Sequence, residues 1–595
     1  MIQKIISKLA SSVGNTQTVE PYGCKIYIDS KELSDYHTFT LQQSFNDHHY
    51  FEITIPTESL LNAGVEQVPR PESLIGKKIV TQLYKGFSLG ADSNDFTGII
   101  TYAGYKQTAA NRTILTIKGQ SKTYMLNTTC DRIYQNQTLR DIVSDIESST
   151  QGQLTIKKNP SLSIFHPIIT QYQQSNMDFL NYIAYTYGQW LFYYQNTLYF
   201  GRPKWLDEKK PITLCLGKNL TTQTVYHEWK PLAQKSFFSY TEAQDKLYQQ
   251  TNWETPNAVL HGSHAANHMQ NADKWMRQNI ASACIPIHAA YKEEIDHYLK
   301  VQRAIAGSQS YTIQGESIEH LLCPATLVSV DNGGIYIITS TTHTFNNHTK
   351  LYNNTFTAIL NTPEAFPYNP NTIKIPKVAP RLAYVVDGPN AKGEMKVCPH
   401  GTTYTKYYAW LPVAQPDIHS RNGGFYFLPV KGSLVLIDHL YGLTCFPYIS
   451  RSMPHGKNTH AADNLNNSKR IISTPKQHKI IFDDQLETRG LTIQDANGSS
   501  IHIQSQEGYI HITSKNLQLQ ANDIQFNSKN TTIDIETLNV RSGKNITIQA
   551  KSIRAEGGNK LLAQADSTAL IGNKALKKTG EKITIAAQEN LNLYA

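Results

Sequence analysis

The chain has 595 residues, 40% of them hydrophobic and 17% charged, a globular composition that argues against intrinsic disorder. Its net charge of +9 comes from lysines and arginines scattered among acidic residues, which argues against a nucleic-acid footprint. The seven cysteines include no C-x-x-C pair, so the sequence suggests neither a disulfide framework nor a structural zinc site.

Residues 1–20 form an N-terminal segment with lysines inside its apolar stretch, so it lacks the apolar core of a secretory signal peptide. No run of 18 apolar residues follows, and the sequence predicts no membrane-spanning helix. The segment is either a short amphipathic helix or a frayed terminus. We expect the protein to assemble in a reducing cytoplasm.

Residues 21–373 are predicted to form a mainly β domain with tandem barrels and an α/β insert. Short segments that alternate apolar and polar side chains indicate half-buried strands. Closely spaced prolines from Pro363 to Pro370 mark the end of the domain. The predicted strands are 26–28, 39–41, 51–55, 96–102, 113–118, 334–338 and 352–360.

The insert is predicted to contain two helices and an aromatic hairpin. Thr138 precedes an apolar helical stripe that runs to Ile146, and Ser175 begins a capping signal for a second helix. Gly188 stands where the second helix would end, because glycine adopts the left-handed C-cap conformation without strain. The hairpin is predicted at 190–200, with two polar residues at its turn.

The segment Gln171–Leu180 resembles the central motif of VgrG proteins, the spikes of type VI secretion systems. That motif is close to Q-Y-x-E-S-x-x-D-F-L, and this chain differs from it by Gln174 at the usual glutamate. Residues 356–370 are similar to the exit of the hub in that family. The order of the predicted domains extends the resemblance from about Gly23 to Ala595.

Residues 374–460 are predicted to form an OB-fold barrel. Their aromatic and basic residues are not arranged as a stacking groove, so we expect no nucleic-acid partner. The resemblance implies a collar between hub and needle, and Pro429–Gly432 is similar to the family's P-x-x-G-D-x-V-L step, with Ser433 replacing the aspartate. The predicted strands are 383–386, 393–397, 408–413, 424–428 and 433–437.

Residues 461–595 repeat a short apolar-polar-apolar unit about every 8 residues, a period too short for helical repeat arrays. Each unit predicts a strand with one apolar face, and the Gly, Asn, Ser and Lys between units are turn residues. The units are 491–493, 501–503, 510–512, 517–519, 524–526, 533–535, 538–540, 546–548 and 553–555, and the pattern returns at 583–585 and 591–593.

A strand of this length buries about two branched side chains, worth roughly 1.5–3 kcal/mol each, which does not offset its ordering entropy. Another strand must cover the apolar face, either in a single-chain solenoid or in a triangular prism of three chains. The short, irregular units favour the triple-stranded β-helix of an intertwined homotrimer. The predicted needle interior is Ile493, Ile501, Ile503, Ile510, Ile512, Leu517, Leu519, Ile533, Ile535, Ile546 and Ile548.

Few residues suggest chemistry. Three histidines from His261 to His268 have the spacing of a helical metal site, but no cysteine or carboxylate completes a ligand set. The acidic group Asp483–Glu487 is better explained as a solvated turn than as paired catalytic acids. His502 and His511 occupy polar positions and should face outward. We therefore expect no catalytic residue, cofactor or metal, and a protein that is not an enzyme.

The resemblance implies a structural spike of a contractile injection machine. Its trimeric hub would sit on a hexameric tube protein similar to Hcp, among baseplate components. The needle would carry effectors and be driven through a target membrane by sheath contraction. A PAAR-repeat tip protein would bind near Leu593 and Tyr594.

Two alternatives stay open at this point. The equivalent hub-spike of a phage tail, or of an extracellular contractile injection particle, has nearly the same sequence pattern. A secreted β-solenoid polysaccharide hydrolase belongs to a different class of protein. It would need a cluster of charged residues on a groove of the coil, and the outward positions of the units offer none.

Overall fold

The computed structural model describes residues 21–58, 70–86, 92–107, 113–228, 235–241, 246–250, 281–284, 292–330, 334–402, 404–417, 424–456, 467–571, 574, 577–582, 584 and 586. The predicted N-terminal segment 1–20 lies outside these residues. The chain divides into two compact units, residues 1–463 and 464–595. Within the described ranges, no helix combines the length and apolar character needed to cross a membrane.

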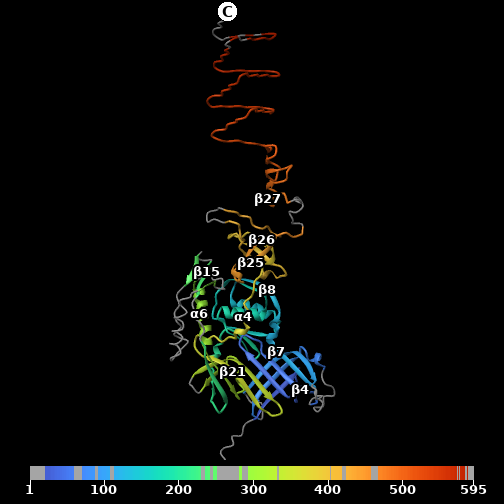
Figure 1. The fold of residues 1–595 in the computed structure, drawn as a ribbon, viewed down its shortest axis with the longest axis vertical. Helices are drawn as coiled ribbons and strands as arrows, with labels where there is room; N and C mark the ends of the chain where they lie inside the picture. Colours follow the sequence, from blue (N-terminus) through green and yellow to red (C-terminus); the bar gives the residue numbers. More distant parts are fainter. Residues whose placement is uncertain are drawn as a thin grey trace, which may run out of the picture. The chain divides into compact units, whose positions relative to one another are not determined.

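The first unit contains a large curled sheet of 13 strands (Figure 1). The strands predicted at 26–28, 39–41, 51–55, 96–102, 113–118, 334–338 and 352–360 are all present in it, which confirms the mainly β fold. The strands are β1 (Tyr22–Ile28), β2 (Lys31–Glu32), β3 (Thr38–Ser44), β4 (Tyr50–Pro56), β5 (Lys78–Lys85), β6 (Ser93–Gln107), β7 (Thr113–Ser121), β13 (Ile212–Leu214), β14 (Leu220–His227), β18 (Tyr311–Ser317), β19 (Leu327–Val330), β20 (Ile335–Asn346) and β21 (Tyr352–Leu360).

The strand order joins the two ends of the hub sequence in one sheet. The order is β14-β18-β21-β20-β3-β4-β7-β6-β5-β1-β2, and β19 links β13 to β20. β20 pairs with β3 in antiparallel register, from Ser340 opposite Ser44 to Asn346 opposite Thr38. Neighbouring strands therefore come from segments about 300 residues apart.

The α/β insert follows the sheet strands of the first half. β8 (Thr129–Gln137) pairs with β10 (His166–Ser175), and a bulge lies between Gln171 and Gln174. β9 (Thr155–Lys158) extends the hairpin of β11 (Leu191–Tyr194) and β12 (Thr197–Phe200). The apolar side chains of the insert share one buried core with the large sheet.

Local signals set the ends of the two helices of the insert. α3 (Leu139–Ser148) has a capping box, in which Thr138 Oγ1 accepts a hydrogen bond from the backbone of Asp141 at 3.2 Å. α4 (Asn176–Thr186) begins at Ser175, whose Oγ accepts from the Asp178 backbone at 3.0 Å. Gly188 follows α4 with φ +66°, as predicted for a helix end.

A smaller part of the hub lies between β14 and β18. β15 (Lys235–Thr241), β16 (Lys246–Gln250) and β17 (Ala281–Cys284) form a three-stranded sheet. α6 (Lys292–Ser310) leads from this region into β18, and its Val301 and Ile305 are buried.

The collar is a five-stranded sheet that closes on itself. β22 (Arg381–Asp387), β23 (Met395–Pro399), β24 (Ala409–Leu411), β25 (Leu434–His439) and β26 (Pro447–Met453) follow the order β24-β23-β22-β25-β26. The two edges meet where Ile449 N donates to Pro412 O and Ala414 N donates to Ile449 O, both at 2.9 Å. Closure removes the unpaired edges.

One predicted strand of the collar is wrong. Residues 424–428 are not a strand of this sheet, and the fifth strand is β26. The segment 424–428 has the length and apolar composition of a strand, but Phe425 and Phe427 are exposed, and its hydrogen bonds go to Gln415 and Asp417 outside the sheet. Length and apolar composition alone therefore do not distinguish a barrel strand from an extended arm.

The second unit begins with a meander of five antiparallel strands. They are β27 (Lys469–Ser473), β28 (Lys479–Asp483), β29 (Gly490–Gln494), β30 (Ser500–Gln504) and β31 (Tyr509–Thr513), each paired with the next. Residues 514–571 continue without a paired strand and form the successive open turns drawn in orange and red (Figure 1). The units predicted from 517 to 555 are thus not paired strands within one chain, because the chain's own sheet ends at β31.

Gly201→Ala should destabilise the hub more than Gly217→Ala. Both glycines have positive φ, +98° and +78°, so alanine adds roughly 1–2 kcal/mol of backbone strain at either site. At 201 a Cβ would lie 1.9 Å from the backbone oxygen of Asn159, whereas nothing lies within 4 Å at 217. We expect a further loss of about 1–3 kcal/mol at 201, measured by chemical denaturation. Equal losses would contradict the tight contact.

Candidate assembly surfaces

The needle meander has one polar and one apolar face, as the alternation predicts. Directly opposite residues of antiparallel strands lie on the same face. Thr492, His502 and His511 form one row, in which Thr492 Oγ1 lies 2.8 Å from His502 Nδ1. The opposite face carries two apolar rows, Leu491-Ile503-Ile510 and Ile493-Ile501-Ile512.

The eleven residues predicted for the needle interior are all exposed within one chain. Their exposed fractions run from 38% for Ile503 to 72% for Ile548. A contiguous apolar surface of this extent marks an interaction surface in a soluble protein. The face therefore needs a cover that one chain does not supply in the described range 467–571. The placement of these residues in a trimer core stays a prediction, and Leu593 and Tyr594 lie outside the described residues.

A turn repeats every 14 residues in the unpaired part of the needle, a period that the count of short units missed. Ser514 Oγ donates to Asn516 O, and Ser528 Oγ donates to Asn530 O, both at 2.9 Å. Ser542 makes the equivalent bond to Asn545 at 2.9 Å, with Gly543 as one added residue. The signal is in the sequence as Ser-Lys-Asn at 514 and 528 and Ser-Gly-Lys-Asn at 542.

A partly buried carboxylate joins the hub to the collar. Asp145 on α3 accepts hydrogen bonds from Tyr134 OH at 3.0 Å and from Tyr407 OH at 2.8 Å, and it pairs with Lys406. Desolvation opposes ionisation of Asp145. The hydrogen bonds from Lys406, Tyr407 and Tyr134 outweigh it and hold the pKa of the carboxyl below its ordinary 3.8. Asp145 is therefore ionised near neutral pH.

A second contact between hub and collar uses a side chain in place of a strand. Gln135 on β8 accepts from Trp410 N at 2.9 Å and donates to Trp410 O at 3.1 Å, as a neighbouring backbone would. Ile133 and Ile168 of the hub lie in the same buried cluster as the collar residues of β22–β26. Hub and collar therefore share a core.

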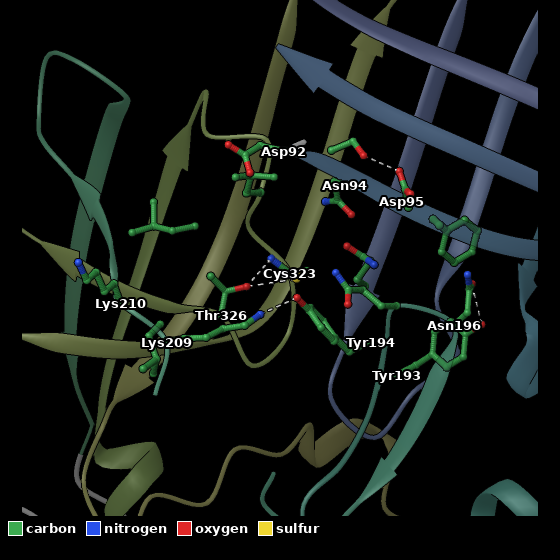
Figure 2. A pocket seen from close by; sticks show the side chains of 17 residues that line it. Asp92, Asn94, Asp95, Tyr193, Tyr194, Asn196, Lys209, Lys210, Cys323 and Thr326 are labelled. Carbon is green, nitrogen blue, oxygen red and sulfur yellow. Dashed lines mark hydrogen bonds between the residues drawn. The ribbon is translucent and has the colours of Figure 1, made fainter. Parts of the chain in front are cut away.

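The hub contains a polar cavity of about 260 Å³ beside the aromatic hairpin. Figure 2 shows Asp92 and Asp95 on one side of it and Lys209 and Lys210 on another. Lys209 Nζ donates to Tyr194 OH at 2.8 Å, so its ammonium group is already engaged. Burial raises the pKa of the Cys323 thiol to about 11, which keeps it protonated and unreactive near neutral pH.

Two buried histidines and the acidic segment 483–487 have structural explanations in the described part of the chain. Burial lowers the pKa of His49 and of His343 to about 3, so both are neutral side chains of the core. Asp483 accepts hydrogen bonds from Gln485 N at 3.0 Å and Thr488 Oγ1 at 2.8 Å, which supports the interpretation of this segment as a turn. His261, His264 and His268 lie outside the described residues, and among the described ones no group of three or more potential metal ligands occurs.

Comparison with known proteins gives the fold a context. Residues 59–349 match the family described as phage tail baseplate hub (GPD). The half-lidded Francisella PdpA-VgrG complex has a chain with a TM-score of 0.51 and 11% identity, covering 86% of this chain and 91% of that one. The lidless form gives a TM-score of 0.50 and 10% identity, covering 83% and 99%.

The chain has a VgrG-like fold, and its residues 59–349 are similar to the phage tail baseplate hub family. The resemblance found at Gln171–Leu180 is thereby confirmed at the level of the fold. The matched family consists of baseplate hubs. This supports the expectation that the protein is a structural component rather than an enzyme.

Two further comparisons complete this context. An E. coli type VI secretion component, the c3393 protein, described as similar to the T4 tail proteins gp27 and gp5, is 17% identical with a TM-score of 0.48. It covers 72% of this chain and 100% of that one. No curated protein matches the chain.

Asp145→Asn should loosen the junction between the VgrG-like hub and its collar. Removing the charge weakens three hydrogen bonds to a partly buried site, which costs about 1–3 kcal/mol near neutral pH and lowers the thermal midpoint. The folded-state pKa of Asp145 is depressed, so its stabilisation is present above pH 3.8 and is lost as pH falls further. The difference between wild type and variant should therefore shrink below about pH 4.

The matched control is Asp207→Asn. Asp207 pairs with Arg202 at the surface, and its side chain is 66% exposed. Such pairs contribute little to stability, so this variant should stay within about 1 kcal/mol of wild type at every pH. Similar behaviour of the two variants would contradict a special role for Asp145.

Proposed function

We propose that this protein is the spike subunit of a contractile injection machine, a homotrimer with a hub, a collar and an intertwined needle. The observation that carries the proposal is the apolar face of the needle, whose rows of isoleucine and leucine are exposed in one chain. Identical copies supply an identical alternation, so three chains can cover each other's apolar face along the whole needle.

Apolar burial and strand pairing both favour three intertwined chains over a needle formed by one chain alone. Each buried isoleucine or leucine contributes roughly 1.5–3 kcal/mol, and the open turns 514–571 gain none of this alone. Their backbone groups also lack strand partners within the chain, whereas strands of neighbouring copies would pair with them. Closed, intertwined strands have no edges to fray, which suits a rod that transmits force.

The partners follow from this role. The hub would seat on a hexameric tube protein of the Hcp type within a baseplate, and the needle would be pushed through a target membrane when the sheath contracts. A PAAR-repeat protein would cover the needle near Leu593 and Tyr594, and effectors would travel with the spike. Assembly would take place in the cytoplasm before injection into the target cell.

The hub-spike of a phage tail is the second candidate. The match of residues 59–349 to the phage tail baseplate hub family favours it as much as the first. The two differ in the genes beside this one, since a phage tail gene cluster and a type VI cluster encode different sheath, tube and membrane components. A polysaccharide hydrolase is disfavoured, because the polar row Thr492, His502 and His511 carries no acidic pair.

The solution mass of the full chain tests the proposal. One chain has a mass of 67.0 kDa, and light scattering should give three times that value. A monomer with a folded needle would instead point to a single-chain coil, and the spike role would then be wrong.

Ile503→Asp should disrupt the needle, whereas the adjacent His502→Asp should not. Ile503 lies between Leu491 and Ile510 on the apolar face, so the change would place one carboxylate per copy inside the trimer. Burying these charges costs several kcal/mol and raises their pKa. The trimer should dissociate at a lower temperature near neutral pH and recover partly below about pH 4, where the carboxyl groups hold protons.

His502→Asp is the matched control, because it puts the same carboxylate one residue away on the polar face. Heating both variants and following the mass by light scattering separates the two faces. Equal tolerance of the two substitutions would overturn the intertwined needle.

A further inference from the structure

The collar carries an arm made of two extended segments, residues 413–417 and 424–430, which we call the aromatic arm. Phe425 N donates to Asp417 O at 2.9 Å. The side-chain amide of Gln415 accepts from Phe427 N at 3.1 Å and donates to Phe427 O at 3.3 Å. Val413 and Ala414 join the arm to the sheet at Ile449, and beyond them the arm is held in a defined extended conformation.

The arm exposes large apolar side chains. Phe425 is 51% exposed, Tyr426 68%, Phe427 54% and Val430 50%. The rings of Phe425 and Phe427 lie on the same side, with centroids 6.4 Å apart. Neighbouring aromatic side chains that remain exposed are typical of a surface that binds a partner.

The hub and collar form an apolar cavity of about 630 Å³ beside this arm. A cavity of about 150 Å³ is enough to hold benzene, so this one can admit more than one aromatic ring. Leu440 lines it and is 49% exposed, which leaves the cavity accessible. Its other apolar lining residues include Pro167, Ile168, Trp410, Pro412 and Tyr448.

The arm lies outside the cavity of its own chain. Tyr426 OH is 3.5 Å from the position that a Cβ on Gly393 would take, and the neighbouring Lys392 and Glu394 line the cavity. The arm thus contacts the loop that walls the cavity, while its rings remain exposed. Arm and cavity are two different surfaces on the same collar, as a head-to-tail interface requires.

We propose that the aromatic arm of one copy places Phe425 and Phe427 in the hub–collar cavity of the next copy, closing a ring of three collars. This inference rests on the proposed trimer. Only 15 residues connect β26 to β27, and they span at most about 50 Å when extended. Needles wound together would hold the collars within this reach, so a second copy is the partner at the highest effective concentration.

Thiol labelling of the full-length assembly tests whether the arm is covered. Phe427→Cys is compared with Phe165→Cys, because Phe165 is 67% exposed and lies outside the arm and the cavity. In one chain the two positions have similar exposure. The ring of collars predicts at least about ten-fold slower labelling at 427, and equal rates would overturn it. Phe425→Cys is the second probe if Phe427→Cys does not assemble.

Cross-linking identifies the occupant of the cavity. The double variant Tyr426→Cys/Leu440→Cys is treated with a short bis-maleimide, and each single variant controls for the native cysteines. Covalent dimers and trimers on a denaturing gel support the ring. Cross-links confined to one chain, or none, with a solution mass of three chains would overturn this inference and leave the spike proposal intact. A solution mass of one chain would overturn both.

Discussion

The structure depends on one constraint, that every β-strand needs a neighbour for its backbone groups and a cover for its apolar face. The hub meets it with long-range pairing, as where β20 lies against β3. The collar meets it by closure, where Ile449 joins the two edges of the sheet. In the needle the chain supplies strand neighbours only from β27 to β31, leaves their apolar face uncovered, and then runs on through open turns. From that point on, the proposed needle depends on other copies.

The junction of hub and collar follows the same constraint with side chains. Gln135 bonds both backbone groups of Trp410 and so continues the hydrogen-bond pattern where no strand fits. Gln415 does the same for Phe427 in the aromatic arm. Asp145 adds an ionised group whose partners come from both domains. A partly buried charge with several partners is costly to separate from them, so Asp145 opposes separation of the collar from the hub.

The sequence predicted what depends on nearby residues. Thr138, Ser175 and Gly188 act within one helical turn, and all three have the predicted roles. The hairpin turn at Gln195 and Asn196 also depends only on nearby residues. A two-residue turn of this kind requires positive φ at both positions, and both residues have it. The VgrG-like motif predicted the fold, which the comparisons confirm, and also an order of domains that stays a prediction.

The remaining features depend on distant parts of the chain. The pairing of β20 with β3 has no local signal. The segment 424–428 has the length and apolar composition of a strand, but whether it joins a sheet depends on which strand edges are free, and β23 and β25 already pair with β24 and β26. The 14-residue turn period was visible at Ser514 and Ser528. Counting only apolar units obscured it.

The position of the meander has a consequence for how the proposed needle forms. β27 to β31 pair only with sequence neighbours, and such local contacts form quickly in one chain. The turns after β31 have no partner within the chain and must wait for other copies. In the proposed trimer the meander would therefore fold first and present its apolar rows, such as Ile501 and Ile512, in a fixed register. A one-residue slip would exchange the apolar and polar faces, so a preset register at the base would guide the winding of the whole needle.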